Sequence, residues 1–92
     1  MSNYNRGANF ERRVKRALEN KGAFVIRSAG SRSPVDLVAF WSGEICFLQV
    51  KVDGNLSKGE RELLTYLAQE NRCRACMAYR DKKKIIFEDL QR

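Results

Sequence analysis

The hydrophobic positions near the N-terminus recur at helical spacing. Between Asn5 and Lys21 most apolar residues have another apolar residue three or four positions away, and the pattern stops before Gly22, a residue type that commonly follows a helix C-terminus. The positions that carry the pattern are Ala8, Phe10, Val14, Ala17 and Leu18. They predict an amphipathic helix whose apolar stripe packs against the rest of the chain.

Short apolar runs bounded by turn residues follow, and they are typical of β-strands. Ser42 and Gly43 predict a tight turn that joins the second and third runs into a hairpin. A basic turn, 81–84, joins the last two runs in the same way. The predicted strands are Ala23–Arg27, Val35–Trp41, Glu44–Val52, Ala75–Tyr79 and Ile85–Glu88.

A second amphipathic helix is predicted between the third and fourth strands, ending near Asn71. Ser57 has the side chain of an N-cap, and Glu60 lies three residues later, which is the pattern of a capping box. Its apolar positions are Leu63, Leu64, Leu67 and Ala68. The element order is therefore αβββαββ, and the fold class is α/β.

Composition limits the size of the core. The 92 residues contain no repeat and no linker, so we expect one domain spanning residues 1–92. A chain of this length buries only about 60 to 65% of its unfolded surface, so association with a second copy would help it. No apolar run reaches the roughly 18 residues of a membrane span, and the N-terminus is polar, so we expect a cytoplasmic protein.

The charge balance favours a polyanionic partner. Eighteen Lys and Arg residues against eleven Asp and Glu residues leave a net charge of +7 and a pI near 9.7. Nucleic acid is the commonest partner of so basic a surface, although many small basic proteins are merely soluble. The chain has no histidine, so catalysis would use carboxylates, lysine or a metal ion.

The three cysteines give little support to a metal or redox site. Cys73 and Cys76 form a single C-x-x-C pair, and Cys46 is the remaining thiol, so one chain cannot supply four sulfur ligands. The alternative is that all three are reduced thiols and that Cys76 packs within a strand.

Polar residues interrupt two of the predicted strands. Asp36 stands in an apolar run, where a carboxylate is costly unless it is paired, hydrogen-bonded or bound to metal. Gln49 and Lys51 are two residues apart in the next predicted strand, so they point to the same face. One interpretation is a wet sheet face with a surface ion pair between Asp36 and Lys51. The other is a functional site at the ends of the strands.

Four segments of the chain together resemble the archaeal-type Holliday junction resolvases, a group of restriction-endonuclease-like nucleases. These segments are Arg6–Arg12, Val25–Ser31, Pro34–Ala39 and Leu48–Lys51. The resemblance fades after Lys51. It implies a restriction-endonuclease-like core, in which helices flank a central mixed β-sheet. It also implies hydrolysis of phosphodiester bonds in DNA.

The resemblance assigns roles to individual residues. Glu11, Asp36, Gln49 and the backbone carbonyl of Val50 would hold Mg²⁺, with Mn²⁺ as a substitute. Lys51 would hold the attacking water or a phosphate oxygen. The predicted contacts to DNA phosphates are Arg6, Arg12, Arg27, Ser31 and Arg32, with Lys58 and Arg61 at longer range; Ser31 is included in the catalytic set.

One position departs from the family pattern, which has a glutamate where this chain has Gln49. An amide oxygen can still coordinate magnesium, so we expect an active nuclease with lowered metal affinity. The resemblance implies a homodimer that nicks a four-way junction symmetrically. The apolar residues Leu63, Leu64, Tyr66 and Leu67 are the candidate dimer surface, unless they only cover the sheet. Two other functions stay open: a junction-binding module that has lost cleavage, and a nuclease of the same fold that acts on other branched DNA.

Overall fold

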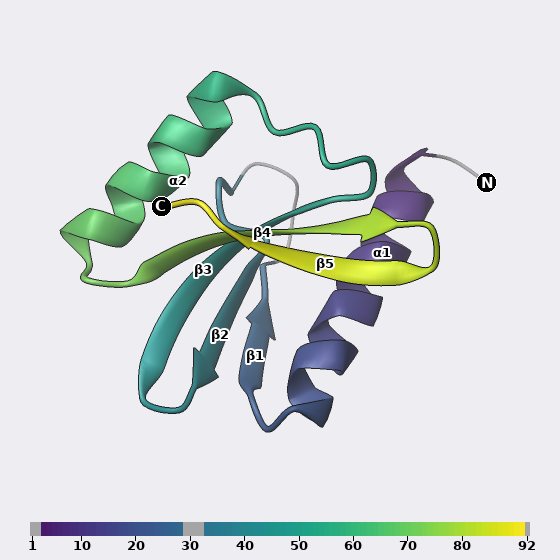
Figure 1. Ribbon diagram of the computed structural model, residues 1–92, viewed down its shortest axis with the longest axis horizontal. Helices are drawn as coiled ribbons and strands as arrows, with labels where there is room; N and C mark the ends of the chain where they lie inside the picture. Colours follow the sequence, from purple (N-terminus) through teal and green to yellow (C-terminus); the bar gives the residue numbers. More distant parts are fainter. Residues whose placement is uncertain (1–2, 29–32, 92) are drawn as a thin grey trace.

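The computed structural model describes residues 3–28 and 33–91 (Figure 1). Its elements are α1 (Asn3–Asn20), β1 (Phe24–Arg27), β2 (Leu37–Trp41), β3 (Glu44–Lys51), α2 (Lys58–Glu70), β4 (Arg74–Asp81) and β5 (Lys84–Asp89). The predicted order αβββαββ is confirmed. The last two strands are longer than predicted, because their pairing continues to Asp81 and Lys84 at the turn. Neither helix in the described ranges has both the length and the apolar character that crossing a membrane requires.

The five strands form one sheet in the order β1-β2-β3-β4-β5. All neighbours are antiparallel except β3 and β4, which are parallel and are connected through α2. The β2–β3 hairpin turns at Ser42 and Gly43, which have φ values of 52° and 80°. Two consecutive residues with positive φ match the strand twist that a two-residue hairpin requires. The turn predicted at these residues is therefore confirmed.

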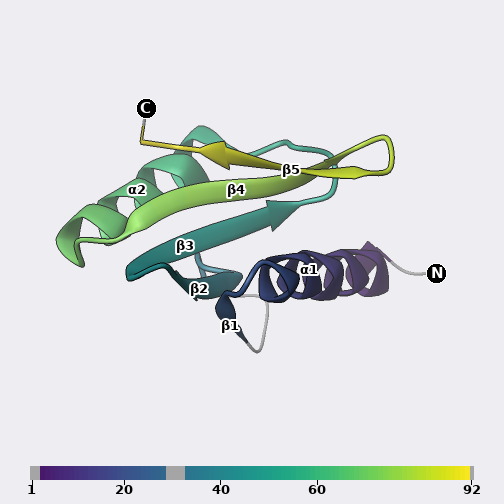
Figure 2. The same cartoon turned by 60° about the horizontal axis from the view of Figure 1, so that its bottom comes forward.

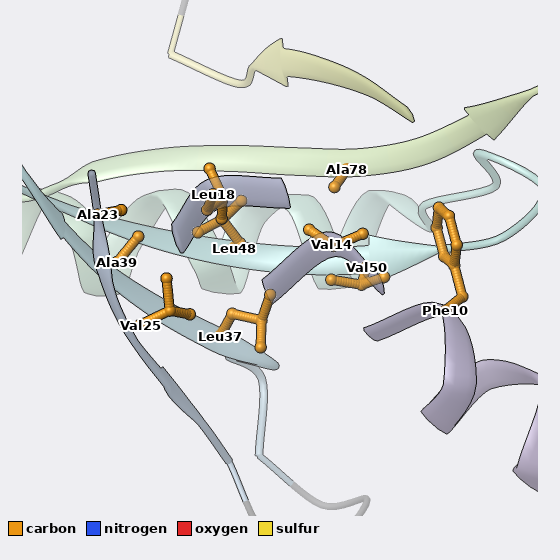
Figure 3. Close-up of a cluster of buried hydrophobic side chains, with 10 residues drawn as sticks. All are labelled: Phe10, Val14, Leu18, Ala23, Val25, Leu37, Ala39, Leu48, Val50 and Ala78. Carbon is orange, nitrogen blue, oxygen red and sulfur yellow. The ribbon is translucent and has the colours of Figure 1, made fainter. Parts of the chain in front are cut away.

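The two helices cover opposite faces of the sheet, as Figure 2 shows. On one face, α1 packs Phe10, Val14 and Leu18 against Leu37 and Leu48, within the cluster drawn in Figure 3. On the other face, α2 buries side chains against β4 and the segment after β5. That second cluster consists of Leu64, Ala68, Ala75, Met77 and Leu90. Most of the predicted apolar stripe of each helix therefore faces the sheet, with Leu63 of α2 as an exposed exception.

Part of the second face is not covered by α2. Phe24 and Ile26 of the edge strand β1 are 64% and 49% exposed, and the Phe24 ring stacks on Phe40 at 5.9 Å. The register pairs Phe24 with Phe40 and Phe40 with Ile45, so these side chains share one face of the sheet. Contiguous exposed aromatic and aliphatic side chains mark an interaction surface. We call this set, Phe24, Ile26, Phe40 and Ile45, the apolar sheet face.

The four α2 residues predicted as a dimer surface divide into two groups. Leu64 is fully buried in the core of the same chain, so its assignment to a dimer surface was wrong. Leu67 is partly buried. Leu63 and Tyr66 are 47% and 56% exposed and remain accessible to a partner. The helical period explains the division, because positions that face the sheet cannot also face outward.

Candidate active site

Asp36 lies immediately before β2, and the backbone on both sides fixes its position. Its N–H donates to the carbonyl of Leu48 at 2.8 Å, and its own carbonyl accepts from the N–H of Ser28 at 2.9 Å. Its side-chain Oδ2 accepts from the N–H of Val50 at 2.8 Å. The carboxylate thus replaces a strand partner for Val50, which lies beyond the start of β2 in the part of β3 that continues past it. It is held at the strand end by its own hydrogen bonds.

The charge of Asp36 is poorly compensated. Its pKa is raised from 3.8 to about 6, chiefly because burial removes the carboxylate from water, although the Val50 N–H opposes the shift. The negative charges of Glu11 and Glu60 raise the pKa further, and the positive charge of Lys51 lowers it. A desolvated carboxylate next to two others creates a negative potential that favours a cation.

Glu11 approaches this region from α1. Its Oε1 accepts from Nε of Arg27 at the end of β1, at 2.9 Å, and both side chains are mostly buried. The pair links the helix to the strand end. Arg27, one of the predicted phosphate contacts, therefore uses Nε to bind the Glu11 carboxylate. Its two terminal amino groups remain as further hydrogen-bond donors.

Gln49 is 6% exposed and faces the turn before β2. Its Nε2 donates to the carbonyl of Pro34 at 2.6 Å. Because that carbonyl can only accept, the amide orientation is determined by the contact. No donor from residues 3–28 or 33–91 reaches Oε1, so the amide oxygen is the available coordinating atom. The N–H and C=O of one strand residue point to the same neighbour, so the Val50 carbonyl points to the side of Asp36.

Lys51 does not pair with Asp36, so the interpretation of a wet sheet face with an ion pair between these two residues is wrong. Its Nζ donates to Oε2 of Glu60, in the first turn of α2, at 2.7 Å. This bond lowers the pKa of the Glu60 carboxyl, with a further contribution from the Ser57 N–H. Glu60 was predicted only as a capping residue. Its role next to Lys51 depends on where the connection after β3 places α2, which sequence spacing does not reveal.

The oxygen atoms around Asp36 fit a hard divalent cation in their chemistry. Two carboxylates, an amide oxygen and a backbone carbonyl are ligands that Mg²⁺ accepts. The part of the chain that the structure describes has no group of three or more acidic, cysteine or histidine side chains placed to hold a metal ion. A cation here would therefore have two carboxylate ligands, Glu11 and Asp36, and would otherwise depend on neutral oxygens or water.

The other predicted contact residues are dispersed. Ser31 and Arg32 lie outside the described residues. Arg12 is exposed and its Nη1 donates to Oδ1 of Asn9 at 3.4 Å. Lys58 and Arg61 lie on the outer side of α2, within 3.9 Å of Glu62 and Glu88 respectively. These two lysine and arginine side chains are already paired with carboxylates on the surface.

Arg6 belongs to a separate basic hollow that the sequence did not indicate. It lines a depression of about 200 Å³ together with Arg13 of α1 and Arg80 of β4, next to Val52. Among the described residues, none of the three guanidinium groups has a carboxylate within salt-bridge distance. Arg13 instead lies over the Phe10 ring, 5.7 Å from its centre. In both Figure 1 and Figure 2 the β4–β5 turn and the N-terminal half of α1 lie at the same end of the molecule, in agreement with the depression that their residues share.

The cysteines do not act as a C-x-x-C pair. Cys76 contacts Cys46 of the neighbouring strand, with the two sulfur atoms 3.1 Å apart. Cys73 instead donates to the Asn71 carbonyl at 3.2 Å. The hydrogen bond to Cys76 and burial raise the pKa of the Cys46 thiol. Cys76 thus lies within the sheet, as the alternative interpretation stated.

The sequence matches the archaeal Holliday junction resolvase (Hjc) family over residues 2–91. It is similar to the crossover junction endodeoxyribonuclease Hjc of Methanocaldococcus jannaschii, with 50% identity over 48 residues. That match spans 52% of this chain but only 35% of the relative. Among solved structures, Hjc of Archaeoglobus fulgidus, a Holliday junction resolvase from an archaeal hyperthermophile, has a TM-score of 0.79 and 28% identity over 94% of this chain and 74% of that one.

The structural match agrees with the predicted restriction-endonuclease-like fold, in which two helices flank a mixed five-stranded sheet. The family match covers both helices and all five strands, whereas the resemblance in the sequence was clear only to Lys51. The chain belongs to the archaeal Holliday junction resolvase family.

Proposed function

We propose that this protein is a metal-dependent, structure-selective endonuclease that hydrolyses phosphodiester bonds in four-way DNA junctions. The observation that carries the proposal is the Asp36 carboxylate, which is desolvated, fixed by the Val50 N–H and close to two further carboxylates. Membership of a resolvase family supports the choice of substrate. Such an enzyme would act in DNA recombination and repair.

The residues around Asp36 have distinct tasks in this proposal. Glu11, Asp36, Oε1 of Gln49 and the Val50 carbonyl would hold Mg²⁺ or Mn²⁺. When bound, the ion eases deprotonation of water and neutralises charge on the phosphate. Lys51 has three N–H donors, of which Glu60 takes one, so the others are available to a phosphate oxygen or to the attacking water. Burial of Asp36 strengthens each of these electrostatic contacts.

Junction DNA would be held mainly through its phosphates. The net charge of +7 favours such contacts, and the basic hollow formed by Arg6, Arg13 and Arg80 supplies guanidinium groups that have no carboxylate partner within residues 3–28 and 33–91. Contacts of this kind give affinity without strong sequence preference, and they weaken steeply as salt concentration rises. Selectivity would come from the arrangement of the four DNA arms.

A homodimer would match the two-fold symmetry of a four-way junction. The exposed apolar sheet face, with Leu63 and Tyr66 of α2, offers a surface for a second copy. A two-fold axis would bring the same patch of each chain together and place two equivalent sites on the DNA. The dimer would carry a charge of 7 + 7 = +14 and would make paired, symmetric nicks.

Labelled four-way junctions incubated with and without Mg²⁺ test the proposal. We expect symmetric nicks that require the metal and that disappear in Asp36→Asn. Glu70→Gln is the matched control, because it removes one exposed carboxylate in the last turn of α2 and should cut like the natural chain. Junction binding without cleavage in either Mg²⁺ or Mn²⁺ would instead select the binding-module function. Equal cleavage of flaps and linear duplexes would contradict the proposed junction selectivity.

A further inference from the structure

Glu60 is fixed by two separate sets of contacts, one for each carboxylate oxygen. It occupies the third position of α2, where its N–H donates to Ser57 Oγ at 3.1 Å and its Oε1 accepts from the Ser57 N–H at 3.1 Å. These reciprocal bonds complete the capping box. Its second oxygen, Oε2, accepts from Lys51 Nζ at 2.7 Å. The helix cap therefore also fixes the position of the Glu60 carboxylate, which binds Lys51.

Gln49 and Glu60 belong to the same side of the sheet. Val50 packs in the core beneath α1, and strand side chains alternate, so Gln49 and Lys51 both point to the α2 side. The bond from Lys51 to Glu60 shows that this side of β3 faces the first turn of α2. Position 49 carries an uncharged amide, whereas α2 brings the Glu60 carboxylate to the same side of β3.

We propose that Glu60 supplies from α2 the carboxylate charge that Gln49 lacks, and that it positions the Lys51 ammonium at the catalytic site. This inference deepens the proposed nuclease function and depends on it. In this arrangement the negative charges of Glu11 and Glu60 both act on Asp36. Glu60 acts through charge and through its hold on Lys51, and it is a positioning residue.

The capping role alone does not explain a glutamate at this position. A glutamine can accept the same bond from the Ser57 N–H, so the cap requires only an oxygen at Oε1. The contact with Lys51 is different, because a carboxylate adds the attraction of opposite charges to the hydrogen bond with the ammonium group, whereas a neutral amide oxygen does not. The substitution Glu60→Gln therefore keeps the cap and the side-chain length while it removes the charge.

The test compares Glu60→Gln, Ser57→Ala and the double variant Gln49→Glu/Glu60→Gln on labelled four-way junctions in Mg²⁺. Ser57→Ala removes the cap hydroxyl but keeps the backbone N–H that fixes Glu60 and the pair with Lys51. We expect Glu60→Gln to lower kcat by about 10- to 100-fold with little change in KM or in thermal unfolding temperature. Ser57→Ala should lower the unfolding temperature and leave kcat near that of the natural chain.

The double variant moves the carboxylate from the helix to the strand. We expect it to recover most of the cleavage that Glu60→Gln loses, because the total charge of the region is restored. Calorimetric titration with Mg²⁺ gives a readout independent of cleavage. Affinity should fall in Glu60→Gln and return in the double variant, by about 10-fold in each direction.

The outcomes separate this inference from the proposed function. If the natural chain cuts junctions and Glu60→Gln cuts equally well, Glu60 only caps the helix and the inference is wrong. A double variant that stays as inactive as Glu60→Gln would also overturn it. If the natural chain cuts nothing in Mg²⁺ or Mn²⁺, the nuclease proposal fails, and unchanged Mg²⁺ affinity in Glu60→Gln would then overturn the inference as well.

Discussion

Replacing Gln49 with glutamate should destabilise the metal-free protein in a pH-dependent way. In the natural chain, Nε2 donates to the Pro34 carbonyl at 2.6 Å from a side chain that is only 6% exposed. An ionised carboxylate has no proton to donate, so the buried carbonyl would face a second acceptor. The contact would change from a hydrogen bond to a repulsion between oxygens.

The magnitude follows from the lost bond and the unsatisfied group. A neutral hydrogen bond contributes about 1 kcal/mol, and a buried polar group without a partner costs about 1 to 3 kcal/mol. We therefore expect Gln49→Glu to lower the free energy of unfolding by about 2 to 4 kcal/mol at pH 8. That loss is a large fraction of the roughly 5 to 15 kcal/mol by which domains are stable.

The pH dependence has a definite sign. The introduced carboxyl would have a higher pKa in the folded state than its value of about 4.3 in the unfolded chain. The folded state would then bind more protons above that value, so the stability of the variant relative to the natural chain falls as pH rises. At pH 4 the protonated carboxyl can donate to the Pro34 carbonyl, and the difference should nearly vanish.

Urea unfolding in EDTA at several pH values between 4 and 8 measures this difference. The introduced carboxylate would also raise the pKa of Asp36, which adds to the loss at high pH with the same sign. Gln49→Met is the control, because it loses the donor without adding a charge and should show a constant loss. Addition of Mg²⁺ should reduce the penalty of Gln49→Glu selectively, since a third carboxylate raises metal affinity. A loss for Gln49→Glu that is the same at pH 4 and pH 8 would refute the reasoning. Unchanged magnesium dependence of cleavage would show that this position is not a ligand.

Three further predictions concern other parts of the molecule. The pKa of Asp36 is raised from 3.8 to about 6, so the metal-free protein should lose stability as pH rises from about 4 to 7. The loss should be about 1 to 2 kcal/mol after solvent screening. Urea unfolding of Asp36→Asn should lack this loss. In fluorescence anisotropy titrations, Arg13→Gln should weaken junction binding and reduce the slope of log affinity against log salt by about 0.9. The control Arg72→Gln, in the turn before β4, should leave that slope unchanged. Phe24→Ser should shift the chain towards the monomer in analytical ultracentrifugation without lowering its unfolding temperature, and an unaltered dimer fraction would exclude the apolar sheet face as the interface.

Much of the fold could be predicted from local patterns. The Ser57 and Glu60 pair predicted the start of α2, and Ser42 and Gly43 predicted the β2–β3 hairpin. A capping box and a tight turn each depend only on residues that are close in the sequence. Asp36 was identified for a similar reason, since a carboxylate within an apolar run requires a partner. In each case the physical cause lies within a few residues of the signal.

The contacts that were missed join segments whose meeting depends on tertiary structure. The Lys51–Glu60 bond spans the loop after β3, and its formation requires α2 to dock with its first turn against that strand. Arg13 and Arg80 come together because the β4–β5 turn reaches the N-terminal half of α1. The periodicity of the sequence does not predict contacts of this kind, so the basic hollow and the position of Glu60 are seen only in the three-dimensional structure.

The parallel pairing of β3 with β4 has a consequence for how the chain folds. Every other neighbouring pair in the sheet, β1–β2, β2–β3 and β4–β5, joins antiparallel strands that also follow one another directly in the chain. The β2–β3 and β4–β5 connections have two residues each and the β1–β2 connection has nine, against 22 between β3 and β4, so their closure costs less entropy. The β3–β4 pair has to wait until α2 has packed across it. Because the same packing brings Glu60 to Lys51, the last long-range closure of the fold and the assembly of the lysine end of the site should occur in one step.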